Sequence, residues 1–342
     1  MSRLALTQGD PAGIGPEILL KLLTGSPARD AWEPLLVAER AALEALRPVL
    51  PDAPWDRLHY LDSLPSREDL DRVDGIPVLD PVGSARALTL GDSGPADAAG
   101  AMAALDAGIA LVRSGVADAL VTAPVSKASI ARHHLPGFKG HTDYLAEVAG
   151  LERYGRDYLM AFLAPELQVA LLTVHVPLRE AIDTAVDGVA LGEALDCLHR
   201  HAGGRIAVAG LDPHAGEGGL LGEEDDRCLR PVVEAARERG LDVRGPESAD
   251  SLFARARRGE FDWVLALYHD QGLIAVKTAS FGLATNWTLG LPFLRTSVDH
   301  GTAFPLAGQG IADAGPMQAV VEATLGLIAG RLPSPPRVET RG

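Results

Sequence analysis

Short apolar runs of strand-like composition alternate with longer segments rich in Ala, Leu, Arg and Glu for most of the chain. The best helix candidates span residues 96–115, 187–201 and 224–240. The best strand candidates are RLALT, PLLVAER, ALVTAP, QVALLTVH, RIAVAG and DWVLALYH. Such alternation is typical of βα units built around a largely parallel sheet. The pattern therefore predicts a doubly wound α/β architecture.

Size and charge narrow the class of protein. A chain of 342 residues with 47% hydrophobic content is long enough for about two domains. Its formal net charge of −15 argues against a nucleic-acid or membrane-surface role, which needs a basic face. No segment approaches the ~20 apolar residues of a membrane span, and the N-terminus lacks a signal-peptide pattern. The two cysteines, Cys197 and Cys228, lack metal-type spacing. We expect a cytoplasmic enzyme with a disordered tail at 331–342.

The loop TQGDPAGIGPE at residues 7–17 is too rich in Gly and Pro for a helix or strand. The spacing of Gly9, Gly13 and Gly15 fits neither the dinucleotide-binding fingerprint nor a Walker A motif. Pro16 suits the first turn of a helix that begins near Glu17. Two interpretations stay open at this point, a tight βα turn without a ligand or an anion-binding loop at a helix N-terminus.

Three of the ten histidines follow apolar runs directly or within a short turn: His175, His214 and His269. Ligands of open α/β sheets bind outside the carboxyl ends of the strands, so these imidazoles are placed to converge there. Three neutral imidazoles with open positions for substrate oxygens are typical of a catalytic metal site. For each histidine alone, a hydrogen-bonded residue at a loop end is the simpler explanation. Together they favour a metal.

A second set of polar residues lies in the apolar and Gly-rich region downstream of His269. Lys277 follows the strand-like GLIAVK, Asn286 lies in ATNWTLGLP, and Arg295 lies in PFLRTSVDHGTA. In so acidic a chain, cations in such a setting favour a carboxylate or phosphate ligand, and a surface charge is the alternative for each. GHTD at 140–143 adds His141 and Thr142, which suit a phosphate or a helix N-cap.

These motifs resemble those of one family, the 4-hydroxythreonine-4-phosphate dehydrogenases of vitamin B6 biosynthesis. The resemblance runs in the same order from the first strand to about residue 310. The motifs that carry it are TQGDPAGIGPE, GHTD, TVHVPLR, GLDPHAGEGG, ADSLF, YHDQGL and TLGLPFLRTSVDHGTA.

The resemblance implies a fold of two α/β/α domains around largely parallel sheets, similar to isocitrate and isopropylmalate dehydrogenases and distinct from a standard Rossmann fold. It places residues 1–132 with about 290–342 in the first domain, and about 133–289 in the second. The site is expected in the cleft and at the interface of a homodimer. The implied reaction is the NAD- or NADP-dependent oxidation of 4-phosphohydroxy-L-threonine at C3. Decarboxylation then gives 3-amino-2-oxopropyl phosphate for pyridoxal 5'-phosphate synthesis.

Carried over residue by residue, the resemblance also implies roles for individual side chains. One divalent metal (Zn, Mg, Co or Mn) is expected on His175, His214 and His269, with one histidine contributed by the partner subunit. Catalytic roles are expected for Asp250, in proton transfer or in support of the metal, and for Lys277. Substrate contacts are expected from His141, Thr142, Lys277, Asn286 and Arg295.

Other functions fit part of the pattern. Paralogous dehydrogenases act on D-threonate or D-erythronate 4-phosphate or on a cis-dihydrodiol, and sequence separates these poorly. A zinc hydrolase would use the same histidines, although no clear general base stands beside them. A phosphometabolite-binding protein would use the anion-binding residues alone. The metal identity and the choice between NAD and NADP stay open.

Overall fold

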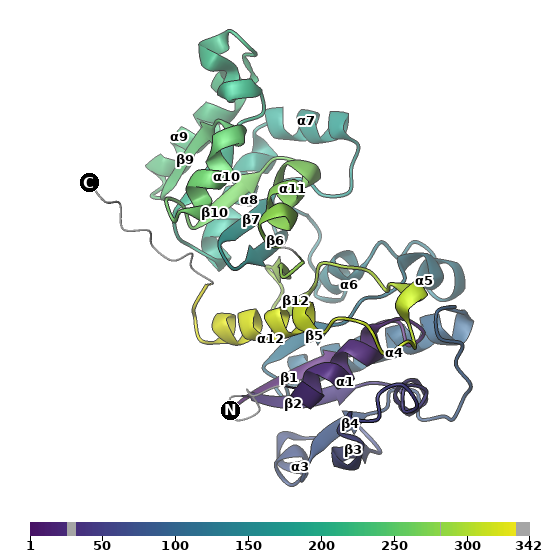
Figure 1. The fold of residues 1–342 in the computed structure, drawn as a ribbon. Helices are drawn as coiled ribbons and strands as arrows, with labels where there is room; N and C mark the ends of the chain where they lie inside the picture. The colour runs from purple at the N-terminus through teal and green to yellow at the C-terminus, as the bar shows by residue number, and fades with distance from the viewer. Residues whose placement is uncertain (26–31, 281, 333–342) are drawn as a thin grey trace. The chain divides into compact units, whose positions relative to one another are not determined.

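The computed structural model describes residues 1–25, 32–280 and 282–332, and its contacts divide the chain into two compact units (Figure 1). Unit 1 is made of Met1–Leu145 and Phe293–Arg331, and unit 2 of Ala146–Pro292 together with Leu332. The sequence places the domain changes near residues 132 and 290, whereas the units change at 145 and 292. The tail predicted to be disordered lies, from residue 333 onward, outside the described residues.

Unit 1 contains a parallel sheet. Its strand order is β3-β4-β2-β1-β5-β12, and every neighbouring pair within it is parallel. The strands are β1 (Ser2–Thr7), β2 (Trp32–Val37), β3 (Leu58–Leu61), β4 (Ile76–Leu79), β5 (Ala119–Thr122) and β12 (Leu294–Val298). The helices are α1 (Gly15–Gly25), α2 (Arg40–Glu44), α3 (Arg67–Asp71), α4 (Pro95–Arg113), α5 (Lys127–His133), α6 (His141–Val148), α12 (Gly315–Ile328) and the short η2 (Trp55–Arg57) and η5 (Phe304–Leu306).

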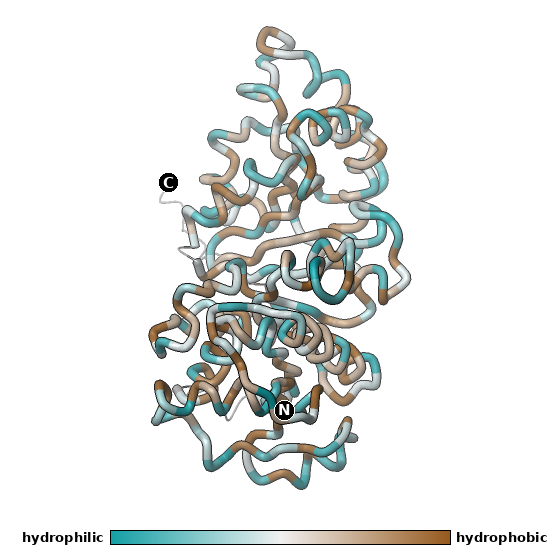
Figure 2. Tube along the Cα trace, turned by 90° about the vertical axis from the view of Figure 1, so that its right-hand side faces the viewer, coloured by the Kyte–Doolittle hydropathy of each residue, from teal (hydrophilic) through white to brown (hydrophobic). Residues whose placement is uncertain are grey.

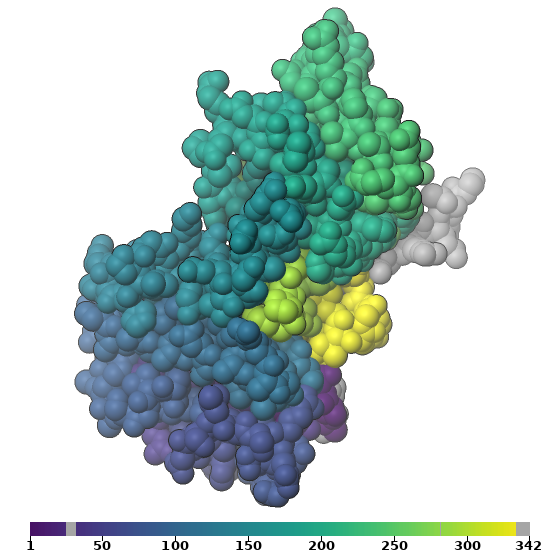
Figure 3. Space-filling model, turned by 180° about the vertical axis from the view of Figure 1, so that it is seen from behind, coloured from purple at the N-terminus to yellow at the C-terminus, as the bar shows by residue number. Residues whose placement is uncertain are grey.

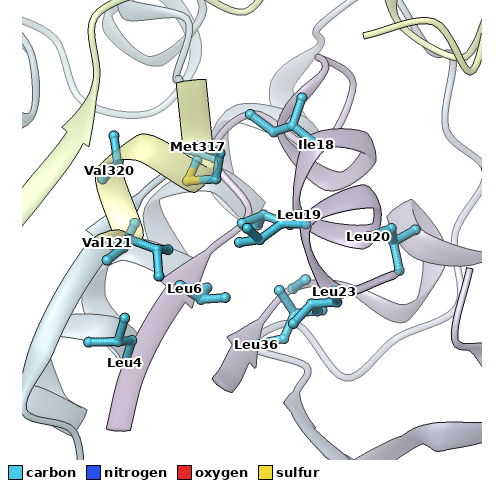
Figure 4. Packing of buried hydrophobic residues seen from close by; sticks show 14 of the residues in the cluster. Leu4, Leu6, Ile18, Leu19, Leu20, Leu23, Leu36, Val121, Met317 and Val320 are labelled. Carbon is cyan, nitrogen blue, oxygen red and sulfur yellow. The ribbon is translucent and has the colours of Figure 1, made fainter. Parts of the chain in front are cut away.

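The core of unit 1 follows from the alternation of side chains along its strands. Leu4 and Leu6 of β1 pack on one face of the sheet with leucines of α1 and with Met317 and Val320 of α12 (Figure 4). Each fully buried leucine contributes about 1.5–3 kcal/mol of transfer free energy. On the other face, Gly108 of α4 approaches so closely that an added Cβ would lie 2.6 Å from Thr7 Cγ2. Helices therefore cover both faces.

Helix α4 is long and apolar enough to cross a membrane by length and composition alone. The sequence-based statement that no segment approaches this length is therefore wrong for α4. However, 61% of its apolar window is buried within the structure. Its close packing at Gly108 and the burial of Met102 and Leu105 identify it as a core helix of unit 1.

Unit 2 contains a mixed sheet in the order β11-β6-β7-β10-β8-β9. The run β7-β10-β8-β9 is parallel, while β6 is antiparallel to both β7 and β11. The strands are β6 (Leu159–Ala164), β7 (Leu167–Leu171), β8 (Ile206–Ala209), β9 (Val243–Glu247), β10 (Trp263–Ala266) and β11 (Thr285–Leu289). The helices are α7 (Leu178–Val186), α8 (Val189–His201), α9 (Arg230–Glu238), α10 (Ala249–Arg257), α11 (His269–Ser280), the 3₁₀ segment η3 (Pro213–Gly219) and the π-helix η4 (Asp225–Leu229).

All six strand candidates overlap strands, and the three helix candidates overlap α4, α8, and η4 with α9. The predicted α/β class with largely parallel strands is confirmed. Hydrophobic and hydrophilic segments alternate along the trace of both units, as the sequence pattern requires (Figure 2). One assignment is wrong: the strand-like GLIAVK lies inside helix α11. Val276 is fully buried and Leu273 is nearly fully buried, whereas Ile274 is exposed. The apolar run therefore buries one face of a helix and leaves another face exposed.

Candidate metal and substrate sites

The opening loop, residues 7–17, is buried throughout, and the hydrogen bonds described below join it to other residues of unit 1. Asp10 accepts hydrogen bonds from the Ala12 N–H at 3.0 Å and from Ser93 Oγ at 2.7 Å. The Ile14 N–H donates to the Thr302 carbonyl at 3.1 Å. Gly15 is required because an added Cβ would lie 1.9 Å from the Gln8 carbonyl oxygen. These contacts favour the tight βα turn over the anion-binding loop.

His175 and His269 approach each other in unit 2. They follow β7 and β10, which are adjacent and parallel, so their carboxyl ends meet at one edge of the sheet. The ring centroids are 5.6 Å apart with planes inclined by 42°. His269 Nδ1 lies 2.8 Å from Asp270 Oδ1. A proton on Nδ1 donated to this carboxylate leaves the Nε2 lone pair of His269 for a metal, so this imidazole fits the role of a ligand.

His214 follows β8, the next parallel strand, on an unusual turn. Residues 214–218 all have left-handed backbone angles, with φ of 55° at His214, 52° at Ala215 and 46° at Glu217. Each such non-glycine residue costs on the order of 1 kcal/mol, and such strain gathers at functional sites. Gly216 and Gly218 adopt the same angles without a Cβ penalty. The part of the chain around residues 213–225 forms the green top of Figure 3.

A buried carboxylate holds the strained turn. Asp225 is fully buried, and its two oxygens accept the Leu211 N–H at 2.9 Å and the Asp212 N–H at 2.7 Å. Burial raises the pKa of Asp225, against the lowering effect of these two bonds. The carboxylate thus fixes the backbone just before His214.

Gln271 connects two of the three strand ends. Its Oε1 accepts the Leu267 N–H at 2.7 Å, and its Nε2 donates to the Gly210 carbonyl at 2.8 Å. Leu267 follows β10 and Gly210 follows β8. The amide therefore fixes the starting points of the loops that lead to His269 and His214.

Asp250 lies at the start of α10, beside His214. Its Oδ1 accepts a hydrogen bond from Ser248 Oγ at 2.6 Å, and this bond lowers the pKa of the carboxyl group. Its Oδ2 lies 4.0 Å from His214 Nδ1, too far for a hydrogen bond but close enough for attraction. Asp250 also lines a cavity of about 610 Å³ along α10 and α11. An ionised carboxylate here suits support of the His214 imidazole.

Among the described residues of the single chain, no three His, Cys, Asp or Glu side chains form a group that could hold a metal ion. The structure brings His175 and His269 together, and separately brings His214 to Asp250. Two imidazoles of one chain therefore need at least one further protein ligand to complete a typical catalytic zinc-like set.

Unit 1 contains a separate cluster of cations. Arg295 of β12 is 1% exposed, and its Nη2 donates to Thr122 Oγ1 at 2.7 Å. Burial lowers the pKa of Arg295 to about 9, so its guanidinium remains charged at neutral pH. The enclosure of the His141 imidazole, with Arg295 and Lys127 nearby, holds the pKa of His141 well below its usual range. His141 starts α6, and Thr142, in its first turn, is buried.

Lys277 and Asn286 belong to unit 2. Lys277 is exposed in the last turn of α11. Asn286 is a partly buried residue of β11, and its Oδ1 is buried without a hydrogen-bond partner among the described residues. An orphaned buried amide oxygen costs free energy unless a ligand satisfies it, which suits the predicted substrate contact.

Sequence reasoning missed three residues of these sites. Gln271 stood inside the quoted motif YHDQGL, but nothing in the motif identifies the Gly210 carbonyl as its partner. Asp225 lies in the acidic run EEDD, which has the composition of a solvated surface. Lys127 lies in PVSKAS, where a lone lysine is unremarkable.

Comparison with known proteins identifies the family. The family model described as pyridoxal phosphate biosynthetic protein PdxA matches residues 30–324. The chain belongs to the PdxA family.

Individual members of this family are similar over nearly the whole chain. A 4-hydroxythreonine-4-phosphate dehydrogenase of Beijerinckia indica subsp. indica is 40% identical, over 93% of this chain and 93% of the relative. The crystal structure of a 4-hydroxythreonine-4-phosphate dehydrogenase from Klebsiella pneumoniae matches with a TM-score of 0.82 and 32% identity, covering 96% of this chain and 100% of the other. A terephthalate 1,2-cis-dihydrodiol dehydrogenase from Burkholderia xenovorans matches with a TM-score of 0.60 and 25% identity, covering 97% and 99%.

These similarities confirm the family resemblance drawn from the sequence motifs, the α/β fold class and the prediction of an oxidoreductase of the dehydrogenase type. The cis-dihydrodiol relative is less similar in both sequence and structure than the 4-hydroxythreonine-4-phosphate dehydrogenases.

Proposed function

We propose that this protein oxidises 4-phosphohydroxy-L-threonine at C3 and decarboxylates the product to 3-amino-2-oxopropyl phosphate, as a step of pyridoxal 5'-phosphate synthesis. The main support is the 40% identity to a 4-hydroxythreonine-4-phosphate dehydrogenase along almost the entire chain. The site residues supply independent support, because they combine imidazoles at strand ends with a separate cationic cluster.

The proposed metal ligands are His175, His214 and His269. A divalent ion (Zn, Mg, Co or Mn) bound there supplies Lewis-acid chemistry at the substrate hydroxyl and the later carbonyl. Asp270 orients the His269 imidazole through Nδ1, and the ionised Asp250 attracts Nδ1 of His214. The hydrogen bond between Nδ1 and Asp270 keeps the Nε2 atom of His269 available for ligation.

We propose that the enzyme is a cytoplasmic homodimer, and that His214 of each chain is a ligand of the metal bound by the second copy of the chain. Two observations support this arrangement. The rings of His175 and His269 are close, yet they form no three-ligand group with His214 in the described part of one chain. The His214 side chain is also 58% exposed, and the backbone just before it is hydrogen-bonded to Asp225.

The substrate residues have complementary chemistry. Arg295 provides a buried positive charge for a phosphate or carboxylate, and neutral His141 with Thr142 provides uncharged hydrogen-bonding groups beside it. In unit 2 the Oδ1 of Asn286 would accept a hydrogen bond from a substrate hydroxyl or ammonium group. Lys277 would act on an anion or in proton transfer, and Asp250 is the second candidate for proton transfer. NAD or NADP, when bound, supplies the hydride acceptor.

Turnover with defined substrates tests this proposal. The purified chain is incubated with each divalent metal, with NAD or NADP, and with 4-phosphohydroxy-L-threonine, and the reduced nicotinamide is followed by absorbance. Parallel reactions contain D-threonate 4-phosphate, D-erythronate 4-phosphate and a cis-dihydrodiol. Preference for 4-phosphohydroxy-L-threonine supports the proposal, and preference for another member of the panel would replace it. Release of phosphate without reduced nicotinamide would indicate a hydrolase, and binding without turnover a binding protein.

A further inference from the structure

Lys127 lies beside the substrate residues of unit 1, although no motif singles it out. It is the first residue of α5, five positions after Thr122 at the end of β5. Thr122 is the residue whose hydroxyl accepts the hydrogen bond from Arg295. Strand β5, whose Thr122 contacts Arg295, is therefore followed within five residues by Lys127.

The position of the Lys127 side chain follows from the backbone of Gly140. Gly140 has φ of +143°, and a Cβ added there would lie 2.9 Å from Lys127 Cε and 3.2 Å from Nζ. The ammonium group thus lies against the residue immediately before His141. The lack of a side chain at Gly140 leaves the space that the lysine occupies.

Three groups able to bind an oxyanion therefore gather at one place. Arg295 and Lys127 both act on the His141 imidazole, whose pKa they lower together with burial. No ion pair or hydrogen bond joins the Lys127 side chain to a residue that the structure describes, and its charge acts on His141. The positive charges of Arg295 and Lys127 repel each other, and an anion bound between them would remove this repulsion. Two cations gathered at one place contrast with the net charge of −15 of the whole chain.

We propose that Lys127 is a substrate-binding residue, whose ammonium group joins Arg295, His141 and Thr142 in binding an oxyanion of the substrate. The inference rests on the proposed function for the identity of the substrate. The shared chemistry is that of a phosphate or a carboxylate. A phosphate carries more charge and more acceptor oxygens, and so makes fuller use of two cations and two hydrogen-bonding side chains.

The experiment compares Lys127→Gln, Lys127→Arg and the control Lys139→Gln with the wild-type enzyme. Lys139 is an exposed lysine of the segment between α5 and α6. Binding of inorganic phosphate is measured by calorimetry, and KM and kcat are measured with 4-phosphohydroxy-L-threonine. Thermal unfolding verifies that each variant is folded.

Loss of one charge-assisted contact is expected to weaken phosphate binding and raise KM by roughly tenfold or more in Lys127→Gln, with a smaller change in kcat. Lys127→Arg should recover part of the affinity, and Lys139→Gln should match the wild type. Unchanged phosphate binding and KM in a folded Lys127→Gln variant would overturn the inference.

A second arm distinguishes the two oxyanions, with 4-hydroxy-L-threonine as the substrate without phosphate. A defect confined to the phosphorylated substrate assigns Lys127 to the phosphate, and an equal defect with both assigns it to the carboxylate. If the wild-type enzyme oxidises neither compound, the proposed function fails. The calorimetric comparison with inorganic phosphate still tests Lys127 in that case.

Discussion

The imidazoles of His175 and His269 lie with their centroids 5.6 Å apart, although 94 positions separate the two residues in the chain (269 − 175). The parallel pairing of β7 with β10 causes this proximity, because it brings the ends of both strands to one edge of the sheet.

Replacement of His269 by Ala should abolish most metal binding. Loss of a group that only supports a ligand weakens metal affinity 10- to 100-fold, so loss of a ligand should weaken it by more than about 100-fold. The metal content of the purified protein and its activity at saturating metal provide the measurements. The matched control is His199→Ala, on the exposed surface of α8. Equal metal content in the two variants would remove His269 from the ligand set.

Replacement of Asp225 by Ala should release the strained turn that carries His214. The change leaves the Leu211 and Asp212 N–H groups without their acceptors, which costs about 1–3 kcal/mol for each one left buried and unsatisfied. We expect a lower free energy of unfolding in denaturant titrations and weaker metal binding.

The matched control for this change is Asp226→Ala. Asp226 pairs with Arg230 on the surface of the same helical segment. Its loss should cost less than about 1 kcal/mol and leave metal binding intact. Similar unfolding free energies for the two variants would show that Asp225 does not hold the turn.

Gly272 of α11 should not tolerate even a methyl group. An added Cβ would lie 2.6 Å from Leu171 Cδ2 and 2.9 Å from Val169 Cγ1, both on β7. Gly272→Ala should therefore push the helix away from the sheet, at a cost of about 1–3 kcal/mol, and displace His269 at its start.

Gly192→Ala in α8 separates this steric effect from helix propensity. A Cβ there would meet its nearest atom, Val232 Cγ1, at an ordinary 3.6 Å. We expect Gly192→Ala to be neutral or to stabilise by up to about 1 kcal/mol. Thermal unfolding and metal titration of both variants check the contrast, and a Gly272→Ala variant as stable as Gly192→Ala would refute the close approach.

The opening loop should make the stability of the protein depend on pH through Asp10. Burial raises the pKa of this carboxyl group above its ordinary value, against the lowering effect of its hydrogen bonds. A raised pKa in the folded state means that the contribution of Asp10 is fully present below the unfolded pKa, and is lost as pH rises through the folded pKa.

Asp10→Asn should therefore reduce the fall in stability as pH rises from about 4 to about 7. Denaturant unfolding of both proteins across this range provides the comparison, and the difference between them isolates Asp10 from other titrating groups. A difference that does not change with pH would show that burial does not shift the pKa of Asp10.

The sequence predicts the strands and the positions of His175 and His269 well, because apolar runs define strand ends and parallel strands share an edge. It fails at Gly272–Lys277, where an apolar run resembles a strand but follows a helical face. It cannot identify Gln271 or Lys127 as parts of a site, because their neighbours, Gly210 and Gly140, lie 61 and 13 positions away (271 − 210 and 140 − 127). Only the folded backbone brings such pairs together.

The shared metal site can be tested most directly in a dimer with one defective histidine in each chain. Differently tagged His214→Ala and His269→Ala chains are coexpressed, and the mixed dimer is purified through both tags. If His214 acts on the partner's site, the mixed dimer contains one intact set of His175, His269 and His214, and one set that lacks two ligands. We predict that each variant alone is inactive and that the mixed dimer recovers about half of the wild-type activity and metal content. A mixed dimer as inactive as its parents would contradict the shared site.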